Sequence, residues 1–130
     1  MNPLSDRELL FFTKLMLRYE TEIKSNPKGY DIKSKELTRF LRANGITLDY
    51  KKRPELYRGE KNTVVFSSHG SRCVDFIRHV RNAFAHGLVV KQGNTYELSD
   101  IYRKQLTMKG SIGMNLLKEL ITKIETTRKQ

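Results

Sequence analysis

The chain has 130 residues, which suits one domain over residues 1–130 with a single hydrophobic core. No apolar run approaches the roughly 20 residues needed to span a bilayer and no secretory signal is visible at the start, so we expect a cytoplasmic protein without membrane contact. Lys and Arg outnumber Asp and Glu by 25 to 14, which gives a net charge of +11. Such a charge favours a polyanionic partner such as nucleic acid, although a role in solubility alone explains the charge about equally well.

The N-terminal third predicts two helices. Ser5 to Glu8 has the pattern of a capping box, which marks a helix start. Apolar residues then recur at three- and four-residue steps until Pro27 and Gly29 end the helix. The buried stripe is expected to comprise Leu9, Phe12, Leu15, Met16, Tyr19 and Ile23. A shorter helix is predicted over residues 33–43, with Leu37, Phe40 and Leu41 buried and a stop at Asn44-Gly45.

Residues 49–61 are rich in charge and predict an irregular basic loop. Two tyrosines, Tyr50 and Tyr57, are interleaved with four cations, an arrangement that suits single-stranded RNA through stacking and phosphate pairing. The candidate RNA-binding cations are Lys51, Lys52, Arg53 and Arg58. The alternative, slightly favoured, is a solvated loop whose tyrosines pack against the core. Residues 63–66 fit either a short strand or the approach to the next helix.

The second half predicts a long helix, a hairpin and a final helix. Cys73, Phe76, Ile77, Val80 and Phe84 fall on one narrow arc of a helix over residues 71–86, which Gly87 ends. Residues 88–98 predict a β-hairpin with a glycine-containing turn at 92–94. Residues 101–110 are ambiguous, and the last helix is expected over 112–126 with Ile112, Leu116, Leu117, Leu120 and Ile124 buried. The fold class predicted is mainly α: a helical bundle with a short β-hairpin before its last helix.

The end of the third predicted helix carries a group of chemically useful side chains. Asn82 and His86 lie four residues apart and therefore share one face, and Arg81 is near enough to reach the same phosphate. Imidazole, with an ordinary pKa of about 6.5, can accept a proton from a ribose 2′-hydroxyl. The Arg81 guanidinium can hold phosphoryl oxygens, and Asn82 can orient the imidazole or a phosphate. This chemistry uses an internal nucleophile and requires neither a metal nor a cofactor.

Two further residues on the polar face, Arg78 and His79, are candidate RNA contacts. His79 lies about 10.5 Å along the helix from His86, too far for both to bind one metal ion, and a solvated surface histidine is its more ordinary interpretation. His69 precedes Gly70 in a loop with nothing nearby in sequence to suggest metal ligation. Cys73, the only cysteine, is expected to be a small buried hydrophobic residue rather than a reactive thiol.

The segment Arg81-Asn82-Ala83-Phe84-Ala85-His86 resembles the R-x(4-6)-H motif of the HEPN superfamily. The resemblance covers the expected architecture broadly but is sharp over these six residues only. It implies a helical bundle with the motif at a helix end, a homodimer with two motifs facing each other, and metal-independent endoribonuclease activity with Arg81, Asn82 and His86 as catalytic residues. It also implies a role as a toxin or defence effector, with a possible antitoxin or regulatory partner.

One position departs from the HEPN toxins that are paired with a nucleotidyltransferase antitoxin. Those toxins carry a modified tyrosine two residues after the histidine, whereas this chain has Leu88 there, which puts that mode of control in doubt. Two rival functions remain open: a nucleic-acid-binding or regulatory module without catalysis, and an interaction subunit whose polar helix face is buried at a dimer seam. The single residues also have ordinary explanations, since His86 suits a helix C-terminus and Arg81 a surface ion pair.

Overall fold

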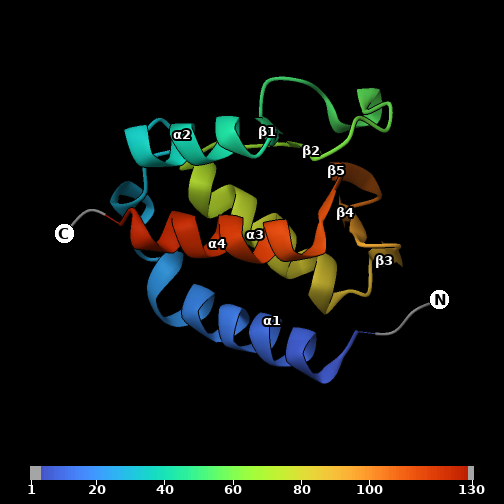
Figure 1. Cartoon of the computed structure of the whole chain (residues 1–130), viewed down its shortest axis with the longest axis horizontal. Coiled ribbons are helices and arrows are strands. Elements are labelled where there is room, and N and C mark those ends of the chain that lie inside the picture. The colour runs from blue at the N-terminus through green and yellow to red at the C-terminus, as the bar shows by residue number, and fades with distance from the viewer. Residues whose placement is uncertain (1–3, 129–130) are drawn as a thin grey trace.

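The computed structural model describes residues 4–128, and in that range five strands and four α-helices build a mixed α/β fold (Figure 1). The helices and strands are α1 (Asp6–Arg18), α2 (Lys35–Ala43), β1 (Thr47–Asp49), β2 (Thr63–Phe66), α3 (Arg72–Ala85), β3 (Val89–Gln92), β4 (Thr95–Tyr102), β5 (Gln105–Gly113) and α4 (Met114–Thr126). Residues 1–3, part of the segment expected to lack a secretory signal, lie outside this range. No helix between residues 4 and 128 is both long and apolar enough to cross a membrane.

The predicted start of the first helix and the predicted glycine stops after the second and third helices are confirmed, whereas α1 ends at Arg18, earlier than predicted. Ser5 accepts a hydrogen bond from the backbone of Glu8 while the Glu8 carboxylate accepts one from the backbone of Ser5, which completes the capping box of α1. Beyond α1 the chain continues through a π-helical turn, Tyr19–Ile23. Gly45 and Gly87 follow α2 and α3 with φ angles of +63° and +69°, the left-handed conformation that ends helices.

The buried stripes are confirmed with few exceptions. All five apolar residues predicted on α3 are buried, among them Cys73, and burial raises the pKa of its thiol to about 12, as expected of a hydrophobic rather than a reactive residue. Along α1, Phe12 and Leu15 are buried, but the prediction for Leu9 is wrong because its side chain is 50% exposed. Ile112 is buried as expected, yet it belongs to β5, since α4 begins only at Met114.

The predicted fold class, a mainly α bundle with one short hairpin, is wrong. The strands form a single sheet in the order β1-β2-β5-β4-β3, in which β1 and β2 are parallel and the other neighbours antiparallel. The β3–β4 hairpin was predicted correctly, but β4 runs on to Tyr102 and β5 occupies the ambiguous segment. Residues 63–66 form β2, which pairs with β5 and so joins the hairpin to the rest of the sheet.

The β4–β5 turn explains why the second hairpin escapes a sequence search. Tyr102 pairs with Gln105, so Arg103 and Lys104 form a two-residue loop, and both have positive φ angles of 51° and 65°. Such a turn normally carries Asn-Gly or another glycine pair, because other residues are strained there. Two long cations give no turn signature, and the segment therefore looks like a continuation of a charged loop.

The helices cover one face of this sheet. Along β4 and β5 the residues Tyr96, Leu98, Met108 and Ile112 are fully buried in the hydrophobic core. Helix α3 packs on β4 and α4 packs on β5, while α1 lies against α3 and α2 against α4 (Figure 1). The residue that follows Tyr96 and Leu98 in this alternation is the polar Asp100, which is also buried and faces α3 near the end of β4.

Candidate functional site

A cavity of about 310 Å³ lies beside the C-terminal half of α3. Helix α3 lines it with Arg78, His79 and Asn82, and His86 follows at the C-cap of the same helix. The opposite wall comes from the ends of β4 and β5 and from the segment that joins β2 to α3. All three histidines of the chain line this one cavity, although they are spread over 18 residues of sequence.

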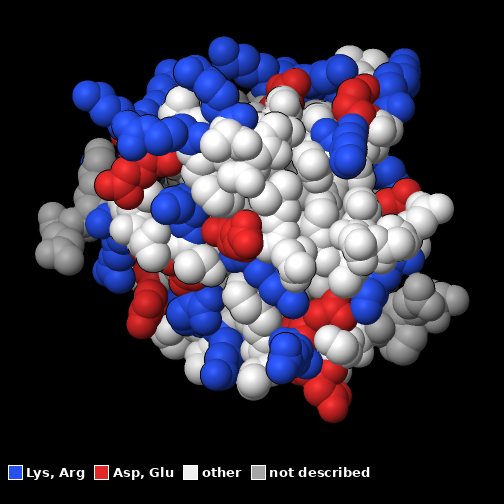
Figure 2. All heavy atoms as spheres, viewed as in Figure 1, with Lys and Arg blue, Asp and Glu red and all other residues white. Residues whose placement is uncertain are grey.

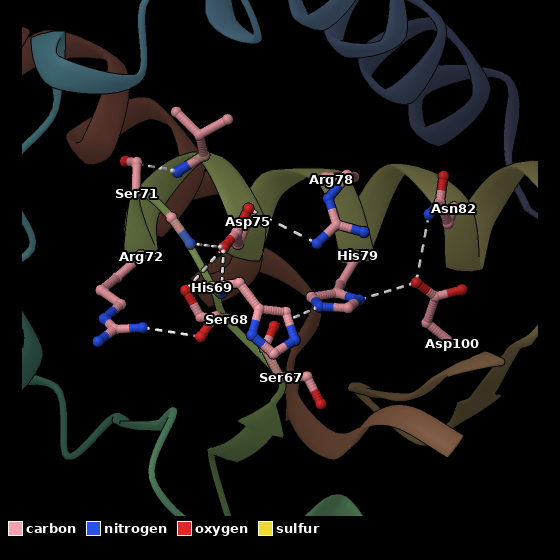
Figure 3. Close-up of polar contacts among 12 residues, drawn as sticks. Ser67, Ser68, His69, Ser71, Arg72, Asp75, Arg78, His79, Asn82 and Asp100 are labelled. Atoms are coloured by element: carbon pink, nitrogen blue, oxygen red, sulfur yellow. Dashed lines mark hydrogen bonds and ion pairs between the residues drawn. The ribbon is translucent and has the colours of Figure 1, made fainter. Parts of the chain in front are cut away.

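The buried carboxylate of Asp100 organises the floor of the cavity. Its Oδ2 atom accepts hydrogen bonds from His79 Nδ1 at 2.8 Å and from Asn82 Nδ2 at 3.3 Å (Figure 3). Burial by itself would raise the pKa of Asp100, but the hydrogen bonds from His79 and Asn82 outweigh burial, and the pKa is lowered. Asp100 is therefore a fixed negative charge that orients two side chains of α3.

His79 is buried, and both of its ring nitrogens contact oxygen atoms. The residue is 1% exposed, and its Nε2 atom lies 2.7 Å from the carbonyl oxygen of Ser67. A carbonyl oxygen and a carboxylate both accept hydrogen bonds, so the two contacts of the ring can be satisfied together only by the doubly protonated imidazolium. The interpretation of His79 as a solvated surface histidine is thus wrong: the ring forms part of the cavity wall and neutralises Asp100.

His86 combines an ordinary structural position with a place in the cavity. As the C-cap of α3 it donates its backbone N–H to the carbonyl of Asn82, as a capping residue does. Its side chain is exposed and lines the cavity one helical turn beyond Asn82. Of the three predicted catalytic residues, Asn82 and His86 therefore share the cavity.

Arg81 points away from the cavity, toward α1 and the π-helical turn. Its Nη1 atom donates to Asn82 Oδ1 at 2.9 Å, and its Nη2 atom donates to Glu20 at 3.2 Å. The guanidinium carbon also lies 6.0 Å from the centre of the Tyr19 ring. Arg81 thus fixes the amide of Asn82, with its oxygen toward Arg81 and its nitrogen toward Asp100, and the guanidinium that lines the cavity is that of Arg78.

The predicted RNA-binding loop lies apart from the cavity. Lys51, Lys52, Arg53 and Arg58 are exposed, but none of them lines it. The two tyrosines of the loop pack inward, as the alternative interpretation had it. Tyr50 packs against the core beneath the guanidinium of Arg72, 4.7 Å from its ring centre, and the hydroxyl of Tyr57 contacts Ser111.

These loop cations belong to a larger basic surface. The exposed Lys33, Lys35, Arg39 and Arg42 of α2 and its approach lie on the same side of the molecule, and Lys and Arg side chains gather over α2 and the β1–β2 loop at the top of Figure 2.

Sequence reasoning missed Asp100 and gave His69 no role. A signal for Asp100 does exist, because Tyr96, Leu98 and Asp100 alternate on one face of a strand, and a carboxylate at a core position needs a buried partner. No such signal exists for His69, whose neighbourhood arises from tertiary contacts alone. The end of β4 also brings the exposed ring of Tyr102 to the cavity rim.

Among residues 4–128, no three His, Cys, Asp or Glu side chains are arranged to hold a metal ion. The cavity instead collects one half-buried guanidinium, which is paired with Asp75 at 3.5 Å, together with one buried imidazolium, two exposed imidazoles and an amide around a neutralised carboxylate. Such a set can bind a phosphate and move protons. No protein-family model, curated protein or solved structure matches this chain.

Proposed function

We propose that the protein is a metal-independent endoribonuclease that cleaves RNA through attack of the ribose 2′-hydroxyl on the adjacent phosphodiester. The observation that carries the proposal is the cavity beside α3, which His86, Asn82 and Arg78 line together with the buried His79–Asp100 pair. The helical bundle implied by the HEPN resemblance is not the fold of this chain. The proposal therefore rests on the cavity and on the Arg81–His86 segment, not on architecture.

Each role follows from position and chemistry. His86 accepts the proton of the 2′-hydroxyl, because it is an exposed imidazole at the cavity. Arg78 stabilises the charge that develops on the phosphoryl oxygens, a part first given to Arg81. Asn82, held by Arg81 and Asp100, is a positioning residue beside the reacting phosphate, and the exposed ring of Tyr102 suits stacking with an unpaired base.

The direct test is cleavage of an end-labelled single-stranded RNA in excess EDTA. The wild type is expected to produce 2′,3′-cyclic phosphate and 5′-hydroxyl ends. His86→Asn keeps a polar residue suited to a helix C-cap but cannot transfer a proton, so we expect a loss of about 100-fold or more. Arg78→Ala is expected to lose activity as well, while Arg7→Ala, an exposed arginine near the start of α1, serves as its matched control. Activity that requires added metal, or that survives His86→Asn, would refute the proposal.

A second candidate, an RNA-binding module without catalysis, is favoured by the basic surface over α2 and the β1–β2 loop, which lies apart from the cavity. It predicts salt-dependent RNA binding that is weakened by Lys51→Ala/Lys52→Ala and indifferent to His86→Asn, with no cleavage by any variant. A homodimer and an antitoxin or other regulatory partner remain proposals drawn from the sequence resemblance. Light scattering at micromolar concentration tests the first of these.

A further inference from the structure

One carboxylate of α3 binds three hydrogen-bond donors of the segment between β2 and α3. Asp75 Oδ2 accepts hydrogen bonds from the Ser68 hydroxyl at 2.7 Å and from the backbone N–H groups of His69 and Gly70, both at 3.1 Å (Figure 3). Burial would raise the pKa of Asp75, but these hydrogen bonds and the nearby Arg78 outweigh it, and the pKa is lowered. The carboxylate therefore stays ionised and keeps the three donors oriented.

Two carbonyl groups of the same segment are also held by side chains of α3. His79 Nε2 contacts the Ser67 carbonyl at 2.7 Å, and Arg72 Nη1 donates to the Ser68 carbonyl at 2.8 Å. Residues 67–70 of this five-residue connection are thus fixed at five points by three side chains of one helix. This is more than is needed to connect a strand to a helix, and it leaves one side chain, that of His69, exposed at the cavity.

His69 and His86 reach the cavity from opposite ends of α3. His69 lies before the N-terminus of the helix, whereas His86 is its C-cap, and the buried cation His79 lies between them. Figure 3 draws both rings, and His69 and His79 both line the cavity. Among the described residues, no hydrogen-bond partner holds the His69 ring, so it is available to a ligand.

We propose that His69 is a second catalytic residue of this cavity, the general acid that protonates the leaving 5′-oxygen while His86 accepts the proton of the 2′-hydroxyl. This inference rests on the proposed function. In the step, a bond forms between the 2′-oxygen and phosphorus and the bond from phosphorus to the 5′-oxygen breaks. The 2′-hydroxyl proton passes to His86 and the proton of His69 passes to the 5′-oxygen. The products are a 2′,3′-cyclic phosphate and a 5′-hydroxyl, with no other reactant consumed.

The experiment compares two substrates that differ in their need for an acid. A short RNA releases an alkoxide that must be protonated, whereas uridine 3′-(4-nitrophenyl phosphate) releases a phenolate that leaves unaided. For His69→Ala we expect a loss of about 100-fold or more on RNA but less than about fivefold on the aryl ester. His69→Gln, which keeps a polar side chain of similar size, should behave in the same way, and His86→Asn should lose activity on both substrates.

Three outcomes would overturn the inference in distinguishable ways. If both His69 variants cleave RNA at close to the wild-type rate, His69 is not the acid, although the proposed function stands. If they lose activity equally on both substrates, His69 acts in binding or in folding rather than in proton donation. If the wild type cleaves neither substrate, the proposed function fails and the role of His69 fails with it.

Discussion

Two buried carboxylates lie in different surroundings, and a comparison of their contacts separates a role in stability from a role in function. Glu8 of α1 and Asp100 of β4 are each 3% exposed. Glu8 is enclosed where α1 meets the β3–β4 hairpin, with Lys91 donating at 2.7 Å and the Tyr96 hydroxyl also donating. Asp100 instead borders a cavity and holds the side chains of that cavity. A buried, hydrogen-bonded carboxylate therefore joins α1 to the β3–β4 hairpin at Glu8, and orients the side chains of the candidate site at Asp100.

The largest stability effect is expected at Glu8. Glu8→Ala removes the buried carboxylate that accepts from Lys91 and from the buried Tyr96 hydroxyl, and should lower the free energy of unfolding by about 3–5 kcal/mol, because breaking a buried ion pair by removing one partner is strongly destabilising. Urea denaturation monitored by circular dichroism measures the change. Glu97→Ala, an exposed carboxylate on the other face of β4, is the control and should stay within about 0.5 kcal/mol of wild type. Similar losses of unfolding free energy in both variants would show that the buried contacts of Glu8 add nothing to stability.

The same carboxylate predicts how stability depends on pH. Burial raises the pKa of Glu8, but the hydrogen bonds from Lys91, Tyr96 and Ser5 outweigh it and lower the pKa from 4.5 to about 2. A lowered pKa means that the contribution is fully present above pH 4.5 and is lost as the pH falls toward 2. The loss should approach about 3 kcal/mol. Denaturation from pH 6 to pH 2 should show a weaker dependence in Glu8→Gln than in wild type; equal dependence would contradict this account.

Asp100 sharpens the contrast, since its replacement should affect activity more than stability. Asp100→Asn keeps an acceptor for His79 but removes the charge that balances the imidazolium, and we expect a stability loss of about 1–3 kcal/mol. RNA cleavage measured well below the melting temperature should fall at least tenfold, because His79 and Asn82 lose their orientation. Glu8→Ala, measured at a temperature where it is folded, should retain most of its activity. The reverse pattern would mean that Asp100 is only a structural carboxylate.

The smallest effect is expected at the β4–β5 turn. Replacing Arg103-Lys104 by Asn-Gly supplies residues suited to positive φ angles and should raise the free energy of unfolding by about 1 kcal/mol. Activity should change little, because neither residue lines the cavity. Thermal denaturation checks this, and a lower melting temperature would show that the contact of Arg103 with the Tyr102 ring, 5.2 Å from the ring centre, outweighs the strain of the turn.

The helices of this chain could be predicted from sequence because their evidence is local. The capping box at Ser5, the arc from Cys73 to Phe84 and the glycines at helix ends act over a few residues. The sheet could not be predicted in full, because its long second hairpin has a turn without glycine and because β2 pairs with β5, far along the chain. The clear helix signals and the missing signals for the second hairpin together predicted a helical bundle, although the molecule is a mixed α/β fold.

The site was predictable to the extent that one helix carries it. Asn82 and His86 share a face by periodicity, and they do share the cavity. The direction of Arg81 depends on Glu20, and the burial of His79 depends on Asp100 and Ser67, contacts that span from 12 to 61 residues of sequence. Helical geometry alone contains no information about these partners.

The measurement that tests the central claim most directly is cleavage of labelled single-stranded RNA in excess EDTA by the wild type and by His86→Asn, with folding checked by circular dichroism. The account predicts that the wild type yields 2′,3′-cyclic phosphate ends and that the folded variant is at least about 100-fold slower. Equal activity in the two proteins, or none in either across varied RNAs, would contradict it and leave the basic surface as the functional region.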